Sequence, residues 1–465
     1  MAAESFNDEC GAYEMHSLDG KTEDLMRAVL DYSRARIGMD PPPLDGPRSE
    51  SYLEGLYGGN LTEDGIDGHE ILRRFVEGYA PATLSADHPR YFAFVPTAPT
   101  KASVMFDLIV SASSVCGTSW LEAAGTTFAE NEALRWLADL AGLGADAGGV
   151  FVSGGSAANL SGIYTGKHQF KQRTGHLGRF SVLASRGAHS SVKSACDLMD
   201  IDVIVVEGDS RERLTGEAVA QKISGLSDDV RSGLFGVIAT AGMTNTGVVD
   251  DLDGIGKVAE REGLWFHVDG AYGAAALAST TRRHLFNGIE RADSMVVDPH
   301  KWLFAPYDCA ALLYKHPEFA AEAHTQKASY LDDINDVPEW NPASYAYHLT
   351  RRVRGLPFWF SLATYGFAKY REAIDYTIVL ADWTAEFVRN SDYLELAIDP
   401  DLSVVVFRRV GWSSSDYERW CQDLLDRQLA FVLPTTYQGE RLMRFCFVNP
   451  KTTVEDVRVV LETMK

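Results

Sequence analysis

The chain has 465 residues, with 43 Lys and Arg against 65 Asp and Glu, and a formal net charge of -22 at pH 7. This length exceeds what one hydrophobic core usually serves, so we expect one large domain with smaller attachments. The acidic charge disfavours nucleic acid and anionic membranes as partners, because both bind clustered Lys and Arg. No segment approaches the ~20 uninterrupted apolar residues of a membrane span, which predicts a soluble protein.

The chain start and the cysteines indicate a cellular compartment. The start, MAAESFNDECGAYEM, lacks the basic region and apolar run of a secretory signal, so a cytoplasmic location is expected. The six cysteines lie far apart without a C-x-x-C pair, which argues against zinc sites and a disulfide scaffold. We therefore expect reduced thiols and no metal at Cys10, Cys116, Cys196, Cys309, Cys421 and Cys446.

The predicted elements change character along the chain. Apolar residues at helical spacing predict helices over 22–37, 69–79 and 128–143. From about Gly149, seven apolar runs alternate with helix-length segments, which indicates a mainly parallel α/β sheet covered on both faces. The runs are GVFV, FSVLAS, DVIVV, LFGVIAT, LWFHV, SMVV and CAALLY. The order strand, helix, strand, helix after about Asp392 predicts a small α+β domain. We expect an N-terminal helical segment at 1–85, a large domain at 86–375 and the small domain at 376–465.

A glycine loop follows the first of these runs, in V-S-G-G-S-A-A-N-L at 152–160. Glycines let the backbone approach an anion, and the free N–H groups at a helix start favour a phosphate. The loop is neither GxGxxG nor a Walker loop, which disfavours a nucleotide. The loop is therefore a candidate phosphate site, and a tight turn without a ligand is the alternative.

Asp269 ends the apolar run of W-F-H-V-D-G-A-Y-G. A buried acid needs a cationic or hydrogen-bonded partner. A protonated pyridine nitrogen is such a partner, and the ion pair would keep the ring able to accept electrons. A helix cap and a metal ligand are the alternatives.

Two further residues follow apolar runs. Lys301 lies in D-P-H-K-W at 298–302, where partial desolvation is expected to lower its pKa and make the amine a nucleophile towards an aldehyde. His300 beside it can reach a phosphate. His189 lies in A-H-S-S-V-K-S-A, and its imidazole can cover a pyridine ring and contact a carboxylate. A surface lysine and a structural histidine are the alternatives.

The four signals together predict one site, because the carboxyl ends of parallel strands form a common ligand-binding edge. An anion loop, an acid, an aromatic base and a lysine supply what pyridoxal 5'-phosphate (PLP) requires. These are a phosphate anchor, a partner for the ring nitrogen, a stacking group and an amine for the aldehyde. The sequence therefore predicts a PLP enzyme.

The sequence resembles the group II PLP-dependent decarboxylases, the family of the aromatic-L-amino-acid, histidine and glutamate decarboxylases. The matching motifs are H-P-R-Y-F-A-F-V-P-T, A-H-S-S-V-K-S-A, H-V-D-G-A-Y, A-D-S-M-V-V-D-P-H-K-W and D-C-A-A-L-L, in order and spacing. The resemblance implies PLP fold type I, the aspartate-aminotransferase-like architecture. It also implies a homodimer whose active sites lie at the subunit interface.

By this resemblance, Lys301 is the Schiff-base lysine, Asp269 the pyridine partner and His189 the stacking histidine, and these three are the expected catalytic residues. Ala271 is the small residue under the ring, and Thr244 lies at the cofactor's edge. The expected cofactor contacts also include Gly155, Ser156, His300 and Asp298, which replaces an asparagine frequent in the family. Phe94, Pro96 and Thr97 are expected to line the substrate pocket.

Two segments depart from the family's pattern. In the family, the segment matching C-G-T-S-W at 116–120 forms a pocket wall for the other subunit, and Cys116 and Thr118 replace larger apolar and aromatic residues. A roomier, more polar substrate pocket is expected. The family also carries a loop tyrosine before an Arg-Arg pair. Counting back from Arg351 and Arg352 reaches 340–342 without a tyrosine, and Tyr345 and Tyr347 are off register.

The resemblance implies α-decarboxylation of an L-amino acid through a quinonoid intermediate, followed by release of an amine. The altered loop favours an alternative in which oxygen intercepts the intermediate and an aldehyde is released. The altered wall favours carbon–sulfur lysis of a bulky amino-acid conjugate, as in antibiotic biosynthesis. A non-catalytic binding protein of the same fold is the remaining alternative.

Overall fold

The computed structural model describes residues 15–332 and 338–465. The chain forms two compact units, Met1–His88 and Pro89–Lys465. Cys10, most of the chain start and part of the segment before Arg351 lie outside the described residues. No helix in the described ranges has the length and hydropathy of a membrane span. The five described cysteines are free thiols, as predicted.

The first unit is helical. Its elements are α2 (Gly20–Gly38), α3 (Glu50–Tyr57), α4 (Gly68–Arg74), the π-helix η2 (Phe75–Tyr79) and the 3-10 turn η3 (Ala80–Ala82). The side chains of Asp19, Ser49 and Asp67 cap the first turns of α2, α3 and α4. The helices predicted over 22–37 and 69–79 are present, whereas α3 was not predicted.

The second unit is built on a seven-stranded sheet. Its strands are β1 (Gly148–Val152), β2 (Phe180–Ser185), β3 (Ile201–Val206), β4 (Leu234–Thr240), β5 (Trp265–Asp269), β6 (Ser294–Val297) and β7 (Ala310–Tyr314). Their order is β1-β7-β6-β5-β4-β2-β3. Only β7 runs antiparallel to its neighbours, and the other pairings are parallel. The prediction of a mainly parallel α/β sheet with seven strands is confirmed.

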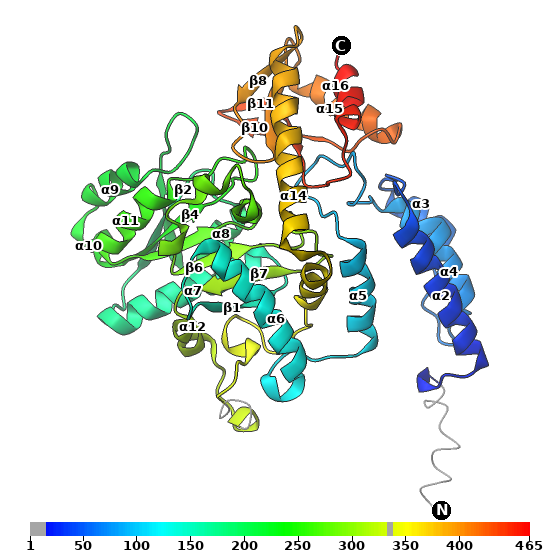
Figure 1. Ribbon diagram of the computed structural model, residues 1–465, viewed down its shortest axis with the longest axis horizontal. Helices are drawn as coiled ribbons and strands as arrows, with labels where there is room; N and C mark the ends of the chain where they lie inside the picture. Colours follow the sequence, from blue (N-terminus) through cyan, green and yellow to red (C-terminus); the bar gives the residue numbers. More distant parts are fainter. Residues whose placement is uncertain (1–14, 333–337) are drawn as a thin grey trace, which may run out of the picture. The chain divides into compact units, whose positions relative to one another are not determined.

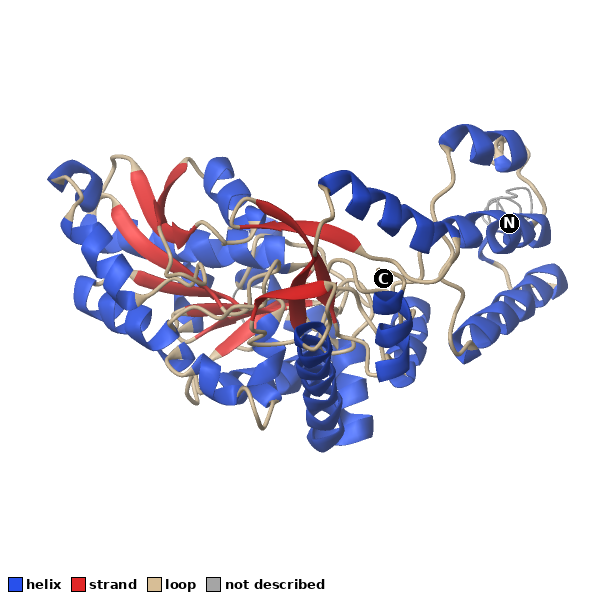
Figure 2. Ribbon diagram, turned by 90° about the horizontal axis from the view of Figure 1, so that it is seen from above, coloured by secondary structure: helices blue, strands red, loops and turns tan. Residues whose placement is uncertain are grey.

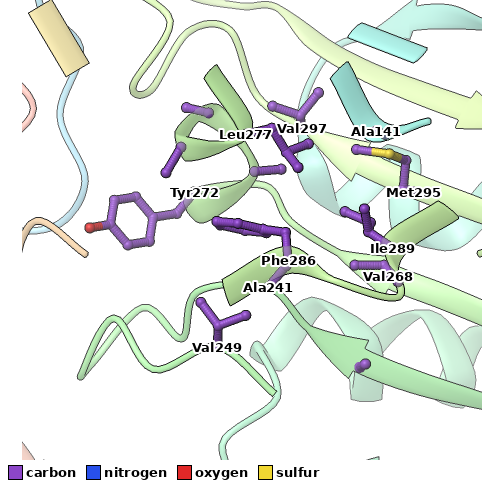
Figure 3. Packing of buried hydrophobic residues seen from close by; sticks show 14 of the residues in the cluster. Ala141, Ala241, Val249, Val268, Tyr272, Leu277, Phe286, Ile289, Met295 and Val297 are labelled. Carbon is purple, nitrogen blue, oxygen red and sulfur yellow. The ribbon is translucent and has the colours of Figure 1, made fainter. Parts of the chain in front are cut away.

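Helices cover both faces of this sheet (Figure 2). They are α6 (Trp120–Ala141), α7 (Gly155–Thr174), α8 (Ser190–Leu198), α9 (Gly216–Ser224), α11 (Leu252–Glu262) and α12 (Pro317–His324). Two further helices belong to this unit: α5 (Lys101–Ala112), which packs on α14 (Leu356–Arg389), and the short α10 (Asp228–Ser232), which precedes β4. Successive residues of β4 point to opposite faces of the sheet. Val237 packs in the hydrophobic cluster that includes α6, α9 and α11, whereas Ile238 packs in the cluster that includes α7 and α8. Figure 3 shows part of the first cluster, where Val268 of β5 and Met295 of β6 lie near Ala141 of α6.

Short 3-10 helices connect the later strands and follow α12. They are η4 (Gly273–Ala278), η5 (Arg283–Phe286), η6 (Ile289–Arg291), η7 (Ser329–Leu331) and η8 (Pro342–Ser344). The first three turn the chain between β5 and β6, and their apolar residues belong to the main hydrophobic core.

The long helix α14 (Leu356–Arg389) leads from this sheet to a second, antiparallel one (Figure 1). Gly366 interrupts α14 at φ +75°, a conformation that favours glycine. The second sheet has the order β10-β11-β9-β8 and carries α15 (Ser414–Asp426) and α16 (Val454–Glu462). Its strands are β8 (Leu394–Ile398), β9 (Val404–Arg409), β10 (Leu433–Tyr437) and β11 (Glu440–Cys446). The smaller C-terminal sheet confirms the predicted α+β arrangement, and the boundary at 376 stays a prediction inside α14.

Two strands of the second sheet were not predicted. β8 and β10 lie at its two edges, so each pairs on one side only. Pro434 interrupts the strand pattern of β10, and an edge position tolerates proline because one side of the strand needs no ladder hydrogen bond.

Candidate active site

A cavity of about 260 Å³ opens where β1, β2, β4, β5 and β6 end. All nine residues expected to contact the cofactor line it: Gly155, Ser156, His189, Thr244, Asp269, Ala271, Asp298, His300 and Lys301. They come from separate crossovers of the sheet and meet because parallel strands present their carboxyl ends at one edge.

The glycine loop gives this cavity an anion-binding end. Helix α7 starts at Gly155, and no side chain caps its first turn. A Cβ on Gly155 would lie 3.0 Å from Oδ2 of Asp298 and 3.1 Å from Cβ of Ala271, so a side chain here would crowd both residues. The first N–H groups of α7 therefore remain available at the cavity edge, and this donor set fits a phosphate.

Asp269 is held by two hydrogen bonds at the end of β5. Its Oδ1 accepts from the backbone N–H of Ala271 at 3.1 Å, and its Oδ2 accepts from Nδ2 of Asn159 at 2.9 Å. The residue is buried and faces the cavity. A fixed, buried carboxylate in this position fits a protonated ring nitrogen, because the ion pair would satisfy its charge.

Lys301 forms an ion pair inside the cavity, with Nζ 2.9 Å from Oδ2 of Asp298. Burial alone would lower the pKa of Lys301, but the charge and hydrogen bond of Asp298, together with the charge of Asp269, raise it. The expectation that desolvation lowers this pKa is therefore wrong. Two carboxylates at the same sheet edge oppose the effect of burial.

A hydrogen-bond chain joins Asp269 to His189. Besides Asp269, Nδ2 of Asn159 donates to Oγ of Ser191 at 2.9 Å, and that oxygen lies 2.8 Å from Nδ1 of His189. Nδ1 of His189 also accepts from the backbone N–H of Ser191 at 3.2 Å. Because Nδ1 is an acceptor, the neutral ring carries its proton on Nε2. Asn159 thus fixes both the acid and the imidazole.

The hydrogen-bond chain continues from Asn159 to His267 and Ser294. Oδ1 of Asn159 lies 2.9 Å from Nε2 of His267, whose Nδ1 lies 2.7 Å from Oγ of Ser294. Burial lowers the pKa of His267 against the opposing charge of Asp269, so the ring is neutral and donates through Nε2. Sequence reasoning missed Asn159, Ser191, His267 and Ser294. All four fall within the motifs quoted above, which was the available signal.

Arg444 of β11 connects the second sheet to the site and was also missed. Its Nε donates to the carbonyl of Thr244 at 2.7 Å, and its Nη1 donates to the carbonyl of Phe94 at 2.6 Å. Its buried Nη2 has no side-chain or backbone partner in the described residues. No sequence spacing links position 444 to 244, because the contact arises only from packing of the two sheets.

The five expected substrate contacts do not belong to the described lining of this cavity. Phe94 is exposed, whereas Pro96 and Thr97 are buried beside it. Oγ1 of Thr97 donates to the carbonyl of Ala305 at 2.7 Å. Sγ of Cys116 lies 3.1 Å from Oγ1 of Thr118, away from the lining residues. Their role in substrate binding stays a prediction.

The two tyrosines before Arg351 are also absent from the cavity lining that the structure describes. Tyr345 stacks on Trp340 at a centroid distance of 3.9 Å, and Tyr347 is 79% exposed. In contrast, Tyr307 lines the cavity, with its ring centroid 5.1 Å from that of His300. Tyr307 directly precedes the D-C-A-A-L-L motif and was not singled out.

The family follows from comparison with known proteins. A family model described as "Pyridoxal-dependent decarboxylase conserved domain" matches residues 67–410. The match covers well over half of the chain, so this protein belongs to the pyridoxal-dependent decarboxylase family. It is a PLP-dependent enzyme of the carboxy-lyase class, and the predictions of family, cofactor and enzyme class are confirmed.

Individual relatives agree with this assignment. An aromatic-L-amino-acid decarboxylase of Bacillus atrophaeus is 29% identical over 99% of this chain and 97% of its own length. A 3,4-dihydroxyphenylacetaldehyde synthase of Aedes aegypti is 27% identical over 87% of this chain and 81% of its own length. A crystal structure of Oryza sativa TDC with PLP and tryptamine has a TM-score of 0.85 at 24% identity, covering 96% of this chain and 97% of that chain. The structural likeness shows the fold.

Proposed function

We propose that this enzyme removes the α-carboxylate of an L-amino acid and releases the corresponding amine. The observation that carries the proposal is the convergence of Lys301, Asp269, His189 and the uncapped start of α7 on one cavity. This set matches the four requirements of PLP: an amine, a ring-nitrogen partner, a stacking group and a phosphate anchor.

Each side chain has a distinct task in this proposal. Lys301 holds the cofactor aldehyde through its amine, and Asp269 keeps the pyridine nitrogen protonated. Bound PLP then supplies an electron sink for the pair left by carbon dioxide. The Nε2–H of His189 is oriented through Ser191 and Asn159, so it can direct the substrate carboxylate.

The remaining lining residues position the cofactor. Gly155, Ser156 and His300 would bind its phosphate, and Thr244 and Ala271 would border its ring. Asp298, whose Oδ2 lies 2.9 Å from Nζ of Lys301, would lie beside the bound cofactor.

We also propose that a second copy of the chain completes the site. The family resemblance supports this, and so do exposed apolar side chains on α5 and α6, among them Ile109, Leu121 and Phe128. Cys116 and Thr118 would then contribute to the neighbouring copy's pocket, with Phe94, Pro96 and Thr97 as further substrate contacts. Light scattering should give the mass of a dimer, and a stable active monomer would contradict it. The cytoplasm is the proposed compartment.

The test of the main proposal is a substrate panel with two simultaneous readouts. The panel contains aromatic, acidic and basic L-amino acids and cysteine S-conjugates, and carbon dioxide release and oxygen uptake are followed together. Carbon dioxide with an equal amount of amine and no oxygen uptake is expected. Absence of carbon dioxide from every amino acid would reject the proposal.

A second candidate is decarboxylation with oxidative deamination, which yields an aldehyde, ammonia and hydrogen peroxide. Neither Tyr345 nor Tyr347 lines the cavity described here, and one relative is a 3,4-dihydroxyphenylacetaldehyde synthase, which favours this candidate. Oxygen uptake equal to carbon dioxide release would select it. Carbon–sulfur lysis, and with it a role in antibiotic biosynthesis, would instead release a thiol from the S-conjugates without carbon dioxide.

A further inference from the structure

Tyr307 contributes a phenol to the lining of the candidate active site. It lies between β6 and β7, six residues after Lys301, and its ring lines the same cavity as Lys301 and His300. The ring centroids of Tyr307 and His300 are 5.1 Å apart and tilted by 47°. A phenol therefore stands beside the residues that hold the cofactor.

The hydroxyl of Tyr307 carries its proton. Partial burial raises the pKa of the phenol, and the charge of Lys301 opposes the rise. A protonated phenol can donate its O–H to an acceptor. The group is therefore a proton donor at neutral pH.

The other tyrosine of the cavity lining is committed elsewhere. The hydroxyl of Tyr272 lies 2.6 Å from Oγ of Ser403 and accepts from the backbone N–H of Ser403 at 3.0 Å. Its ring is stacked on Trp302 within the core, at a centroid distance of 5.3 Å. Burial raises the pKa of Tyr272 far above its ordinary value. Of the two phenols, Tyr307 is the one whose hydroxyl remains for chemistry.

We propose that Tyr307 protonates the substrate carbon from which carbon dioxide has departed. This inference rests on the proposed decarboxylation. In the step, the phenol O–H bond breaks and a C–H bond forms with the electron pair left by the carboxylate. The phenolate regains a proton from water at its solvent side, since the side chain is 54% exposed. No oxidant or reductant takes part.

The proposal explains how this chain forms an amine without a tyrosine at the loop position before Arg351. Rapid proton transfer from within the cavity converts the electron pair on this carbon into a C–H bond before oxygen reacts with it. The choice between amine and aldehyde then depends on Tyr307, a residue of the chain's own β6–β7 connection.

The test compares Tyr307→Phe with Tyr347→Phe in the PLP-loaded enzyme. Each variant loses one phenol oxygen, and Tyr347 is exposed and outside the described cavity lining. For Tyr307→Phe we expect amine formation to fall about 10²-fold, the scale of general acid catalysis, with carbon dioxide release less affected and aldehyde becoming the main product. Tyr347→Phe should keep the wild-type ratio of amine to aldehyde.

A second measurement separates the step from decarboxylation. By microscopic reversibility, a group that delivers this proton also removes it, so the wild type should exchange one α-hydrogen of an amine for deuterium in D2O. Tryptamine is the first probe, followed by the amine of the amino acid that the panel selects. Tyr307→Phe should bind the amine, seen as a change in visible absorbance, without exchanging its hydrogen. Tyr307→His should restore part of the exchange.

The outcomes are distinct. Amine yield and deuterium exchange at wild-type levels in Tyr307→Phe would overturn the proposal, and so would a wild type that binds the amine without exchange. A change of product in Tyr347→Phe alone would assign the proton to the loop of a second copy instead. If Tyr307→Phe does not take up PLP, deuterium exchange by Tyr307→His decides whether the residue at this position transfers the proton. Failure of the wild type to release carbon dioxide would reject the proposed decarboxylation, while amine exchange would still report on Tyr307.

Discussion

Nζ of Lys301 lies 2.9 Å from Oδ2 of Asp298, whose side chain is 1% exposed and whose Oδ1 has no hydrogen-bond partner among the described side chains and backbone. This ion pair raises the pKa of the lysine and favours its protonated form. It also controls when the amine becomes a nucleophile, because only the neutral amine attacks an aldehyde.

Asp298→Asn should shift PLP uptake to lower pH. The substitution removes the nearest negative charge, so the raised pKa of Lys301 falls and the neutral amine is populated at a lower pH. The measurement is the pH dependence of the rate at which cofactor-free protein gains its visible absorbance. Asp308→Asn is the matched control, since Asp308 lines the same cavity but pairs with Arg354 at 2.9 Å. An unchanged midpoint in Asp298→Asn would contradict the role of this pair.

Lys301 should carry the cofactor covalently. After borohydride reduction of the PLP-loaded protein, peptide mass spectrometry is expected to find the cofactor on the peptide containing Lys301. Lys193, an exposed lysine paired with Asp197, should remain unmodified. In Lys301→Ala no reduced adduct should form and decarboxylation should be lost. A persistent adduct on another lysine would remove Lys301 from this role.

Asn159→Leu should impair catalysis because it would misplace the carboxylate of Asp269 and the imidazole of His189. The change leaves Oδ2 of Asp269 and Nε2 of His267 without their present partner, and it releases Ser191 from Asn159. We expect kcat to fall about 10²-fold, the effect of a misplacement near 1 Å. The loss of buried hydrogen bonds should lower the free energy of unfolding by about 1 to 3 kcal/mol. Steady-state kinetics with Ser161→Ala, on the same helix, provides the comparison, and equal kcat values would contradict the positioning role.

Arg351 and Glu130 should contribute strongly to stability. Nη2 of Arg351 contacts both carboxylate oxygens of Glu130 at 2.8 and 2.7 Å, and both side chains are almost fully buried. Arg351→Met leaves a buried unpaired carboxylate, so the free energy of unfolding should fall by about 3 to 5 kcal/mol. Adding Glu130→Leu should recover part of this loss. Urea unfolding of the two single variants and the double variant gives the coupling, and additive losses would argue against the pair.

His324 should make the protein sensitive to acid. Burial lowers the pKa of His324 to about 4, below the roughly 6.5 expected in the unfolded chain. A depressed folded-state pKa gives stability that is present above pH ~6.5 and is lost as the pH falls towards 4. Between pH 7 and pH 4, the wild type should therefore lose about 3 kcal/mol more than His324→Gln. Urea unfolding at several pH values measures the difference in free energy of unfolding between the two proteins. This difference should not change with pH if His324 titrates normally.

The strands of the large sheet were predictable because their signal is local. Runs such as FSVLAS and LFGVIAT are apolar on both faces, and both faces of the corresponding strands are buried. Residues shortly after such runs, among them His189 and Lys301, were predictable as site candidates for the same reason. Parallel strands bring their carboxyl ends together whatever their order in the sheet.

The sequence by itself therefore determined the mainly parallel sheet, the PLP family and the set of side chains at one edge of that sheet. Only the tertiary structure decided how those side chains are charged and held. It paired Lys301 with Asp298, which reversed the expected direction of the lysine pKa, and it joined Asp269 to His189 through Asn159. It also brought Tyr307 into the cavity while Tyr345 packed on Trp340. The strand pattern depends on residues that are neighbours in the sequence. A pKa or a hydrogen bond depends on groups far apart in the chain, which only packing brings within a few ångströms of each other.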